Sequence, residues 1–330
     1  MEKLVEVKSL RVLFKTEEGT VNAVDGLDFE IRRSETLGIV GESGCGKSIT
    51  ASALLGLIPK SAEIGSGSSI VFDGIDVLKA SNAALRRIRG DRAAMIFQEP
   101  MTSLNPVFRI GDQVREAIEL HRDLPRSAAD ARVRELLTLV GIPSPERIAQ
   151  SFPHTLSGGM RQRVMIAMAL ACDPELLIAD EPTTALDVTI QAQILELMKD
   201  LKRSVNASIL LISHNMGVIA EMCDRIIVMY AGRAVEEGTA RDVFREPLHP
   251  YTEGLLRSIP SITKKRARLD SIEGTVPNPL AMPPGCAFAP RCPYVKPECT
   301  SSMPSLLRMG EDRAVRCFLR GSGTEERMMP

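Results

Sequence analysis

The 330-residue sequence lacks any apolar run long enough to cross a bilayer. Its longest uninterrupted run, residues 164–172, is about half of what a membrane-spanning helix needs. The N-terminus is mixed and charged, without the basic start and apolar centre of a secretory signal. We therefore expect a cytoplasmic protein without membrane spans.

A strong charge of either sign is also absent, because the formal net charge is −1. This balance gives no basic field for wrapping nucleic acid, so we expect no nucleic-acid partner. The basic run at residues 264–268 is interpreted as a solvated linker. With 44% apolar and 25% charged residues, the composition is ordinary for a globular protein of one large domain with an appendage, or of two domains.

The sequence lacks the even number of cysteines that a disulfide framework requires, because it has seven. Four of them fall near the C-terminus, with five, six and seventeen residues between them: Cys286, Cys292, Cys299 and Cys317. This spacing differs from the C-x-x-C of a typical zinc knuckle. Four thiolates in a cytosolic protein suit a metal better than disulfides, but the spacing alone leaves zinc, another metal centre and free thiols open.

The order of apolar segments indicates an α/β fold. Two strands with a turn near Glu18 and Gly19 are expected over residues 4–31, and polar helices over residues 106–152. From about Pro247 the sequence becomes proline-rich and aperiodic, which predicts an irregular C-terminal segment. Compact apolar strands of a parallel sheet covered on both faces are expected at residues 36–40, 175–180, 208–213 and 225–230.

A phosphate-binding glycine loop follows the first of these apolar strands, in the sequence GESGCGKS. Its backbone N–H groups and the following helix would cradle phosphates, Lys47 would reach the β- and γ-phosphates, and the Ser48 hydroxyl would bind Mg²⁺. The nucleotide-binding residues expected here are Gly41, Glu42, Ser43, Gly44, Cys45, Gly46, Lys47, Ser48 and Ile49.

Two adjacent carboxylates end the apolar strand at residues 176–180. Asp180 would hold Mg²⁺ through water, and Glu181 would orient or deprotonate the water that attacks the γ-phosphate. The plainer alternative is an acidic pair at a helix N-terminus, which the apolar strand directly ahead disfavours.

A third motif, LSGGMRQR at residues 156–163, joins the glycine loop, ADEPTTALD and LLISHN in one order. Together they resemble the ATP-binding cassette ATPases of ABC transporters over roughly residues 4–245. The resemblance implies an ABC-type P-loop ATPase domain at residues 1–245, built of a RecA-like parallel-sheet core, an antiparallel β subdomain and a helical subdomain at about residues 105–172. An irregular, cysteine-containing extension would follow at residues 246–330.

The same resemblance implies further site residues. Phe14 stands where the family stacks an aromatic ring on adenine, although it could equally be a core residue. Gln98 matches the Q-loop, which senses Mg²⁺ and the γ-phosphate and faces the membrane partner. His214 matches the switch histidine that contacts the γ-phosphate.

The signature loop of the family corresponds to Ser157, Gly158 and Gly159, which would cap the ATP held by a second cassette. Asp187 would lie across the same interface, although elsewhere it would pass for a helix cap. Met160 departs from the Gln of many relatives. The loop donors remain, so we expect a competent site.

The segment EPLHPYTEGLL and the four-cysteine segment are similar to the C-terminal extension of the dipeptide, oligopeptide and nickel permease ATPases. The whole chain most resembles the D-type ATPase of dipeptide and oligopeptide permeases. This resemblance implies a subunit of a peptide importer, and the alternative is the same type of subunit serving nickel or another small solute. A soluble ABC ATPase of DNA repair or translation lacks support, because the chain has neither a coiled-coil insertion nor two cassettes.

The resemblance also implies partners and cofactors. A related, non-identical F-type ATPase, two transmembrane permease subunits and an extracytoplasmic solute-binding protein would complete the transporter, docked near residues 98–106 at the cytoplasmic face of the inner membrane. ATP and Mg²⁺ would act at the glycine loop. The family associates its extension with a [4Fe–4S] cluster, which the four cysteines would satisfy in preference to zinc.

Overall fold

The computed structural model describes residues 2–98, 103–184, 187–205, 207–259 and 272–321. Its strands are β1 Lys3–Thr16, β2 Gly19–Arg32, β3 Thr36–Val40, β4 Ala62–Ile64, β5 Ser69–Phe72, β6 Ile75–Asp76, β7 Ala93–Ile96, β8 Leu176–Asp180, β9 Ser208–Ser213, β10 Arg225–Tyr230, β11 Arg233–Thr239, β12 Leu307–Arg308 and β13 Ala314–Val315. Its α-helices are α1 Lys47–Leu54, α2 Asn82–Ile88, α4 Ile110–Glu119, α5 Arg126–Leu139, α6 Pro145–Ala149, α7 Gly158–Ala169, α8 Val188–Val205, α9 Met216–Met222, α10 Ala240–Arg245, α11 Pro250–Arg257 and α12 Pro297–Ser301, with 3-10 turns η1 Pro153–Thr155, η2 Ala289–Arg291 and η3 Phe318–Arg320.

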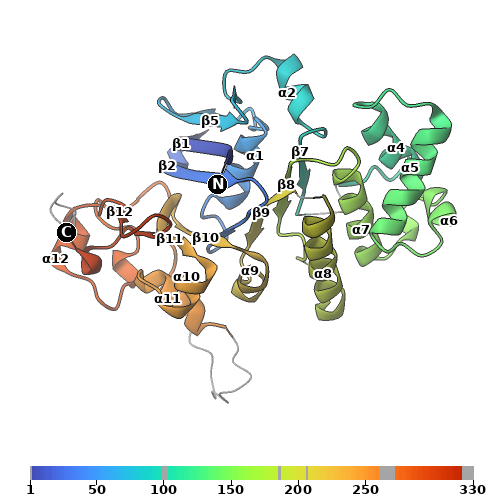
Figure 1. Ribbon diagram of the computed structural model, residues 1–330. Helices are drawn as coiled ribbons and strands as arrows, with labels where there is room; N and C mark the ends of the chain where they lie inside the picture. Colours follow the sequence, from blue (N-terminus) through green and yellow to red (C-terminus); the bar gives the residue numbers. More distant parts are fainter. Residues whose placement is uncertain (1, 99–102, 185–186, 206, 260–271, 322–330) are drawn as a thin grey trace.

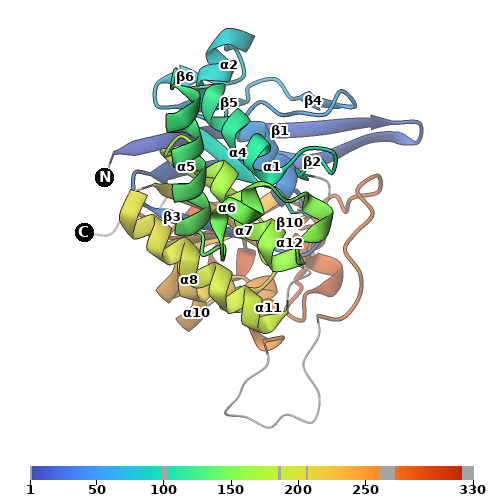
Figure 2. The ribbon, with the colours of Figure 1, turned by 90° about the vertical axis from the view of Figure 1, so that its right-hand side faces the viewer.

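The first part of the chain forms an antiparallel sheet in the order β2-β1-β5-β6, with β4 also paired to β1. Figure 2 shows β1 and β2 as a long hairpin. Their pairing runs from Lys3 with Arg32 to Thr16 with Gly19, which confirms the two strands and the turn predicted between them. Apolar residues on the inner face of β1 pack into a buried cluster that also covers β3 and α1.

The main sheet has the order β12-β13-β11-β10-β3-β9-β8-β7. Strands β7, β8, β9, β3 and β10 are parallel neighbours. All of them except β7 were predicted from their largely apolar sequences, which are typical of strands buried on both faces. Because parallel strands end at one edge, the glycine loop after β3 and the carboxylates at the end of β8 come to the same side of the sheet.

Helices α4, α5, α6 and α7 fill the chain between β7 and β8 and lie at the β7 end of the sheet (Figure 1). Buried apolar side chains of α4, α5 and α7, including Val114, Val133 and Val164, join the cluster that also holds β8 and β9. This packing fixes the start of α7, and therefore the motif at residues 156–163, relative to the sheet.

The C-terminal segment after α10 lies at the other end of the main sheet (Figure 1). Its proline-rich sequence predicts irregular structure, but β13 pairs antiparallel with β11 and extends the main sheet. Glu236 on β11 is fully buried, and its carboxylate accepts hydrogen bonds from the backbone N–H groups of Leu248 and His249, both at 2.8 Å. The segment is thus joined to the sheet by backbone pairing and by a buried charge. The predicted linker at residues 264–268 lies outside the described residues.

None of the helices in the described part of the chain is both long and apolar enough to cross a membrane.

Candidate nucleotide site

The glycine loop runs from the end of β3 into α1, with close backbone approaches that only glycine permits. A Cβ at Gly41 would meet the Met229 carbonyl oxygen at 2.2 Å, and one at Gly46, where φ is +100°, would meet the Ala23 carbonyl oxygen at 2.3 Å. Gly44, with φ +79°, has nothing within 4 Å of its Cβ position. The loop is therefore pressed against the protein at its ends and open at its middle, which is the shape of an anion-binding nest.

Lys47 lies inside this loop. Its ammonium group donates hydrogen bonds to the Gly41 carbonyl at 2.8 Å and the Glu42 carbonyl at 3.0 Å, and the residue is only 5% exposed. Its positive charge is thus held within the nest formed by the loop. Ser43 and Ser48 are exposed, whereas Ile49 packs partly against the core beneath the loop.

Asp180 is a buried carboxylate at the end of β8, only 4% exposed. Burial raises its pKa, while a hydrogen bond from Ser48 opposes the rise and the charge of Glu181 adds to it. Its Oδ1 atom is buried without a hydrogen-bond partner. A buried carboxylate oxygen beside a serine hydroxyl is a donor set that fits Mg²⁺, which explains an otherwise costly orphan atom.

Glu181 is held by three side chains. Its Oε2 accepts hydrogen bonds from Gln98 Nε2 at 3.0 Å and Thr184 Oγ1 at 2.8 Å, and His214 Nδ1 lies 3.1 Å from Oε1. Burial alone would raise the pKa of Glu181, but the hydrogen bonds from His214 and Thr184 outweigh it, so the pKa lies below its usual value. The carboxyl group is therefore ionised at neutral pH, as a base requires.

The backbone of Glu181 is also unusual, with φ +48° in the left-handed region. Its N–H donates to the Ile212 carbonyl on β9 at 2.9 Å, which holds this conformation in place. Strained non-glycine residues of this kind concentrate at functional sites.

The predicted signature loop lies at the start of α7. Ser157 is exposed, and its hydroxyl accepts a hydrogen bond from the Met160 N–H at 3.3 Å as the N-cap. A Cβ at Gly159 would approach Ile190 Cγ2 of α8 to 2.8 Å, so the glycine is needed for this packing. Asp187 is exposed and caps α8 by accepting from the Ile190 N–H at 3.0 Å. Figure 1 shows α1 and α7 apart, on opposite sides of β7 and β8.

Phe14 is half-buried on β1, opposite Val21 and Ala62, and packs partly against the core cluster under the glycine loop. Its contacts among the described residues are those of a partly buried core residue. Adenine stacking by its ring stays a prediction.

Three residues beside the site escaped sequence analysis. Thr184, which holds Glu181, lies within the ADEPTT motif, where a hydroxyl three residues after the carboxylate was a usable signal. Tyr251 and Arg291, which contact Glu42, lie 209 and 249 residues away along the chain. No local pattern reports such a contact.

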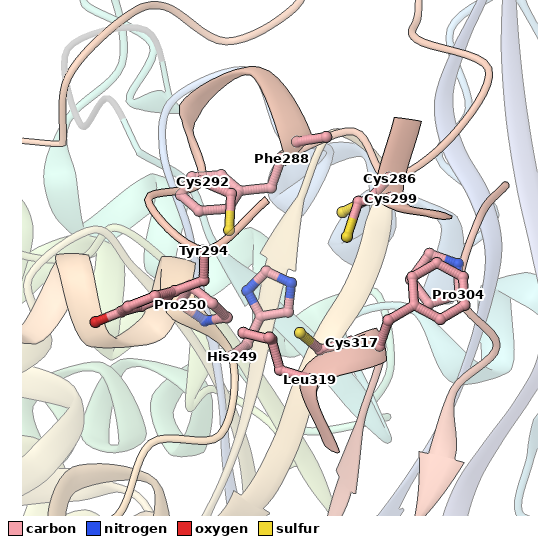
Figure 3. Close-up of a pocket in the computed structure, with 12 residues that line it drawn as sticks. His249, Pro250, Cys286, Phe288, Cys292, Tyr294, Cys299, Pro304, Cys317 and Leu319 are labelled. Carbon is pink, nitrogen blue, oxygen red and sulfur yellow. The ribbon is translucent and has the colours of Figure 1, made fainter. Parts of the chain in front are cut away.

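The expectation of a [4Fe–4S] cluster at the C-terminal cysteines, with zinc as its alternative, is wrong. Among the described residues, no group of three or more His, Cys, Asp or Glu side chains is placed to hold a metal ion. The four thiols line one pocket with His249 (Figure 3), whose cavity of about 10 Å³ has room for roughly one water.

Burial raises the pKa of two thiols that line this pocket, Cys286 and Cys292, and raises that of Cys317 to about 11. His249 Nδ1 already accepts a hydrogen bond from the Tyr251 N–H at 3.0 Å.

The fold and the site together define the class of the protein. A glycine loop between a parallel strand and a helix, with paired carboxylates on a strand of the same sheet, is the arrangement of a P-loop nucleotide hydrolase. The family model described as ABC transporter matches residues 24–184, and the one described as the C-terminal region of oligopeptide/dipeptide transporters matches residues 235–299.

The chain is similar along its whole length to curated relatives. It is 53% identical to the oligopeptide transport ATP-binding protein AppD of Bacillus subtilis, covering 97% of both chains. It is 49% identical to the oligopeptide transport ATP-binding protein OppD of Salmonella typhimurium, covering 96% of this chain and 93% of that protein. The chain therefore belongs to the family of ABC transporter ATP-binding proteins, in its oligopeptide and dipeptide branch.

A solved structure shares the cassette fold. The dimeric ATP-binding cassette MJ0796, in a post-hydrolysis state with ADP and phosphate, matches with a TM-score of 0.65 and 27% identity, over 72% of this chain and 99% of that one. The protein has the ABC ATPase cassette fold with mixed α/β sheets.

Proposed function

We propose that this chain binds and hydrolyses ATP to drive the import of oligopeptides or dipeptides through membrane permease subunits. The observation that carries the proposal is the full-length similarity to AppD, at 53% identity over 97% of both chains. The site supports it, because the glycine loop, Asp180 and Glu181 lie at one edge of the sheet with the side chains that orient them.

Each site residue has a proposed task. The loop N–H groups from Gly41 to Ser48 bind the phosphates, and Lys47 turns its charge toward them. Ser48, Asp180 and Gln98 would hold Mg²⁺, which would supply positive charge to neutralise the phosphates. The Asp180 oxygen without a partner supports this assignment.

Glu181 is the proposed general base for the attacking water. Its ionised carboxylate accepts the proton, while Gln98 and His214 keep it aimed and add polar contacts to the γ-phosphate. Phe14 would stack on adenine, completing the nucleotide pocket.

A second cassette is proposed to complete the site. Ser157, Gly158 and Gly159 would cap the ATP of the opposite cassette, with Asp187 at the same interface. The exposed signature loop, distant from α1 of its own chain in Figure 1, supports action in trans, as does the dimeric state of MJ0796.

The division of the chain is part of the same proposal. Residues 1–245 form the ATPase, with its helical subdomain at about residues 105–172, and residues 246–330 form a peptide-permease-type extension. The family match over residues 235–299 supports this assignment of the extension.

Membrane partners are proposed to dock beside the helical subdomain. Large apolar side chains are exposed there, with Phe97 43%, Val107 71% and Phe108 53% exposed, and such groups mark protein contacts. Residues 99–102 of the expected docking region lie outside the described residues. The assembly would contain a related F-type ATPase, two permease subunits and a solute-binding protein, with this chain at the cytoplasmic face of the inner membrane.

The test is a transporter purified with its permease subunits and reconstituted into liposomes. We expect peptide-stimulated ATP hydrolysis and ATP-dependent peptide uptake, both abolished by Lys47→Ala because the phosphate ligand is lost. Arg257→Gln, an exposed change on α11, should retain both. Uptake that continues at the normal rate with Lys47→Ala would refute the proposal.

A further inference from the structure

Two side chains of the C-terminal segment, Tyr251 and Arg291, form hydrogen bonds with Glu42, the second residue of the glycine loop. The Glu42 N–H donates a hydrogen bond to the Tyr251 hydroxyl oxygen at 2.8 Å. The Arg291 guanidinium donates to both carboxylate oxygens of Glu42, at 2.7 and 3.0 Å. Backbone and side chain of one loop residue are therefore both held from outside the loop.

The guanidinium of Arg291 is fixed in place. It is 5% exposed, and it also donates to the Glu273 carbonyl at 3.0 Å and the Tyr230 hydroxyl at 3.3 Å. Its hydrogen bonds to Glu42 raise its pKa, so the charge is permanent. A bidentate arginine–carboxylate pair is directional, and burial makes it hard to replace by water.

Glu42 also links the hydrogen bonds from Tyr251 and Arg291 to Lys47. The Glu42 carbonyl oxygen accepts hydrogen bonds from Lys47 Nζ at 3.0 Å and from the Cys45 N–H at 3.3 Å. A shift of Glu42 would therefore displace both the lysine that reaches the phosphates and the turn that forms the nest.

We propose that Arg291 and Tyr251 position the phosphate-binding loop through Glu42, so that the C-terminal segment sets the affinity of the cassette for ATP. The inference rests on the proposed function, because it assigns the loop to ATP. Arg291 is a positioning residue, since it acts on Lys47 through Glu42.

The test compares variants of the full chain for MgATP affinity, measured by equilibrium binding, and for KM and kcat in the assembled transporter. Arg291→Gln should weaken MgATP binding by roughly tenfold and raise KM in parallel. The kcat at saturating ATP should change less than about twofold, because Glu181, Gln98 and His214 keep their own contacts. Arg291→Lys, which keeps the charge, should recover part of the loss.

A double-mutant cycle tests the route through Glu42. Glu42→Gln should weaken binding like Arg291→Gln, and the double variant should lose no more than either alone. Arg257→Gln on α11, whose partner is Glu253, is the matched control and should bind MgATP as the wild type does.

The outcomes separate this inference from the proposed function. If the wild type and Arg257→Gln fail to bind MgATP, the assigned function and the inference both fall. If they bind and Arg291→Gln binds equally well, even with a lowered melting temperature, Arg291 is only a structural anchor and the inference alone is overturned. Should Arg291→Gln not fold, Glu42→Gln carries the test: normal affinity overturns the inference.

Discussion

Glu181 illustrates how single residues are set for their task. It has a left-handed backbone, φ +48°, and a carboxylate held by Gln98, Thr184 and His214. Each contact restricts one degree of freedom of the side chain, and the lowered pKa keeps it ionised. A base held in this way needs little reorganisation when the substrate arrives.

Motifs predicted the local part of the site, because glycine loops and strand-terminal carboxylates carry their chemistry within a few residues. Lys47, Ser48 and Asp180 were identifiable for this reason. Arg291 was not, since its partner Glu42 is 249 residues away and nothing in the local pattern reports the pairing.

The buried side chain of His249 leads to a prediction about pH. His249 is only 2% exposed, and burial lowers its pKa from 6.5 to about 3. The unfolded chain gains a proton below pH 6.5 while the folded chain stays neutral, so stability is full above pH 6.5 and is lost as the pH falls toward 3. At pH 5 the loss from this residue is about 2 kcal/mol.

The measurement is chemical denaturation of the wild type and His249→Asn between pH 7.5 and 5. Asparagine can still accept the Tyr251 N–H, so the cap remains. Glu236 titrates in both proteins and cancels from the difference. The variant should lose less stability on acidification, and an equal loss would show that His249 is not the titrating group.

Among the elements, those with a clear apolar pattern in the sequence occur where that pattern predicted them. The strands predicted at residues 175–180, 208–213 and 225–230 have apolar central residues, and they occur as β8, β9 and β10. Strands β12 and β13 did not, since two residues each are too few to show alternation. They form because β13 pairs with the edge of β11 and β12 pairs with β13, which are tertiary contacts.

The start of α7 carries an element-scale prediction. Ser157→Arg should lower ATP hydrolysis in the assembled transporter by more than about tenfold, because a long cation would obstruct the partner's phosphate site. The variant's own glycine loop should still bind MgATP. Site-specific turnover in a transporter carrying one altered cassette measures the effect.

Ser157→Ala is the comparison, because it removes only the cap at a cost of about 1 kcal/mol and leaves the loop open. If Ser157→Arg leaves hydrolysis at the partner's site normal, the signature loop does not act in trans.

For the whole molecule, the C-terminal segment is expected to be required for stability. Tyr251 and Phe288 are buried in the cluster that contains Tyr230 and Val243. Ending the chain after Arg245 would expose the rest of this cluster to water and remove the backbone donors of Glu236. Each large apolar side chain left exposed costs about 1.5 to 3 kcal/mol, so we expect a large loss of stability.

Thermal unfolding of the shortened and full chains checks this expectation. A shortened chain that melts well below the full one, or that fails to fold, agrees with it. Equal melting temperatures would show that the segment is an independent appendage.

The most direct test of the account replaces the proposed base in the complete transporter, by Glu181→Gln, with Glu253→Gln on α11 as the control. We predict that Glu181→Gln retains MgATP binding and favours closed cassettes, while ATP turnover falls by about 100-fold or more. The control should turn over ATP normally. Undiminished turnover by Glu181→Gln would contradict the assignment of Glu181 as the base for ATP hydrolysis.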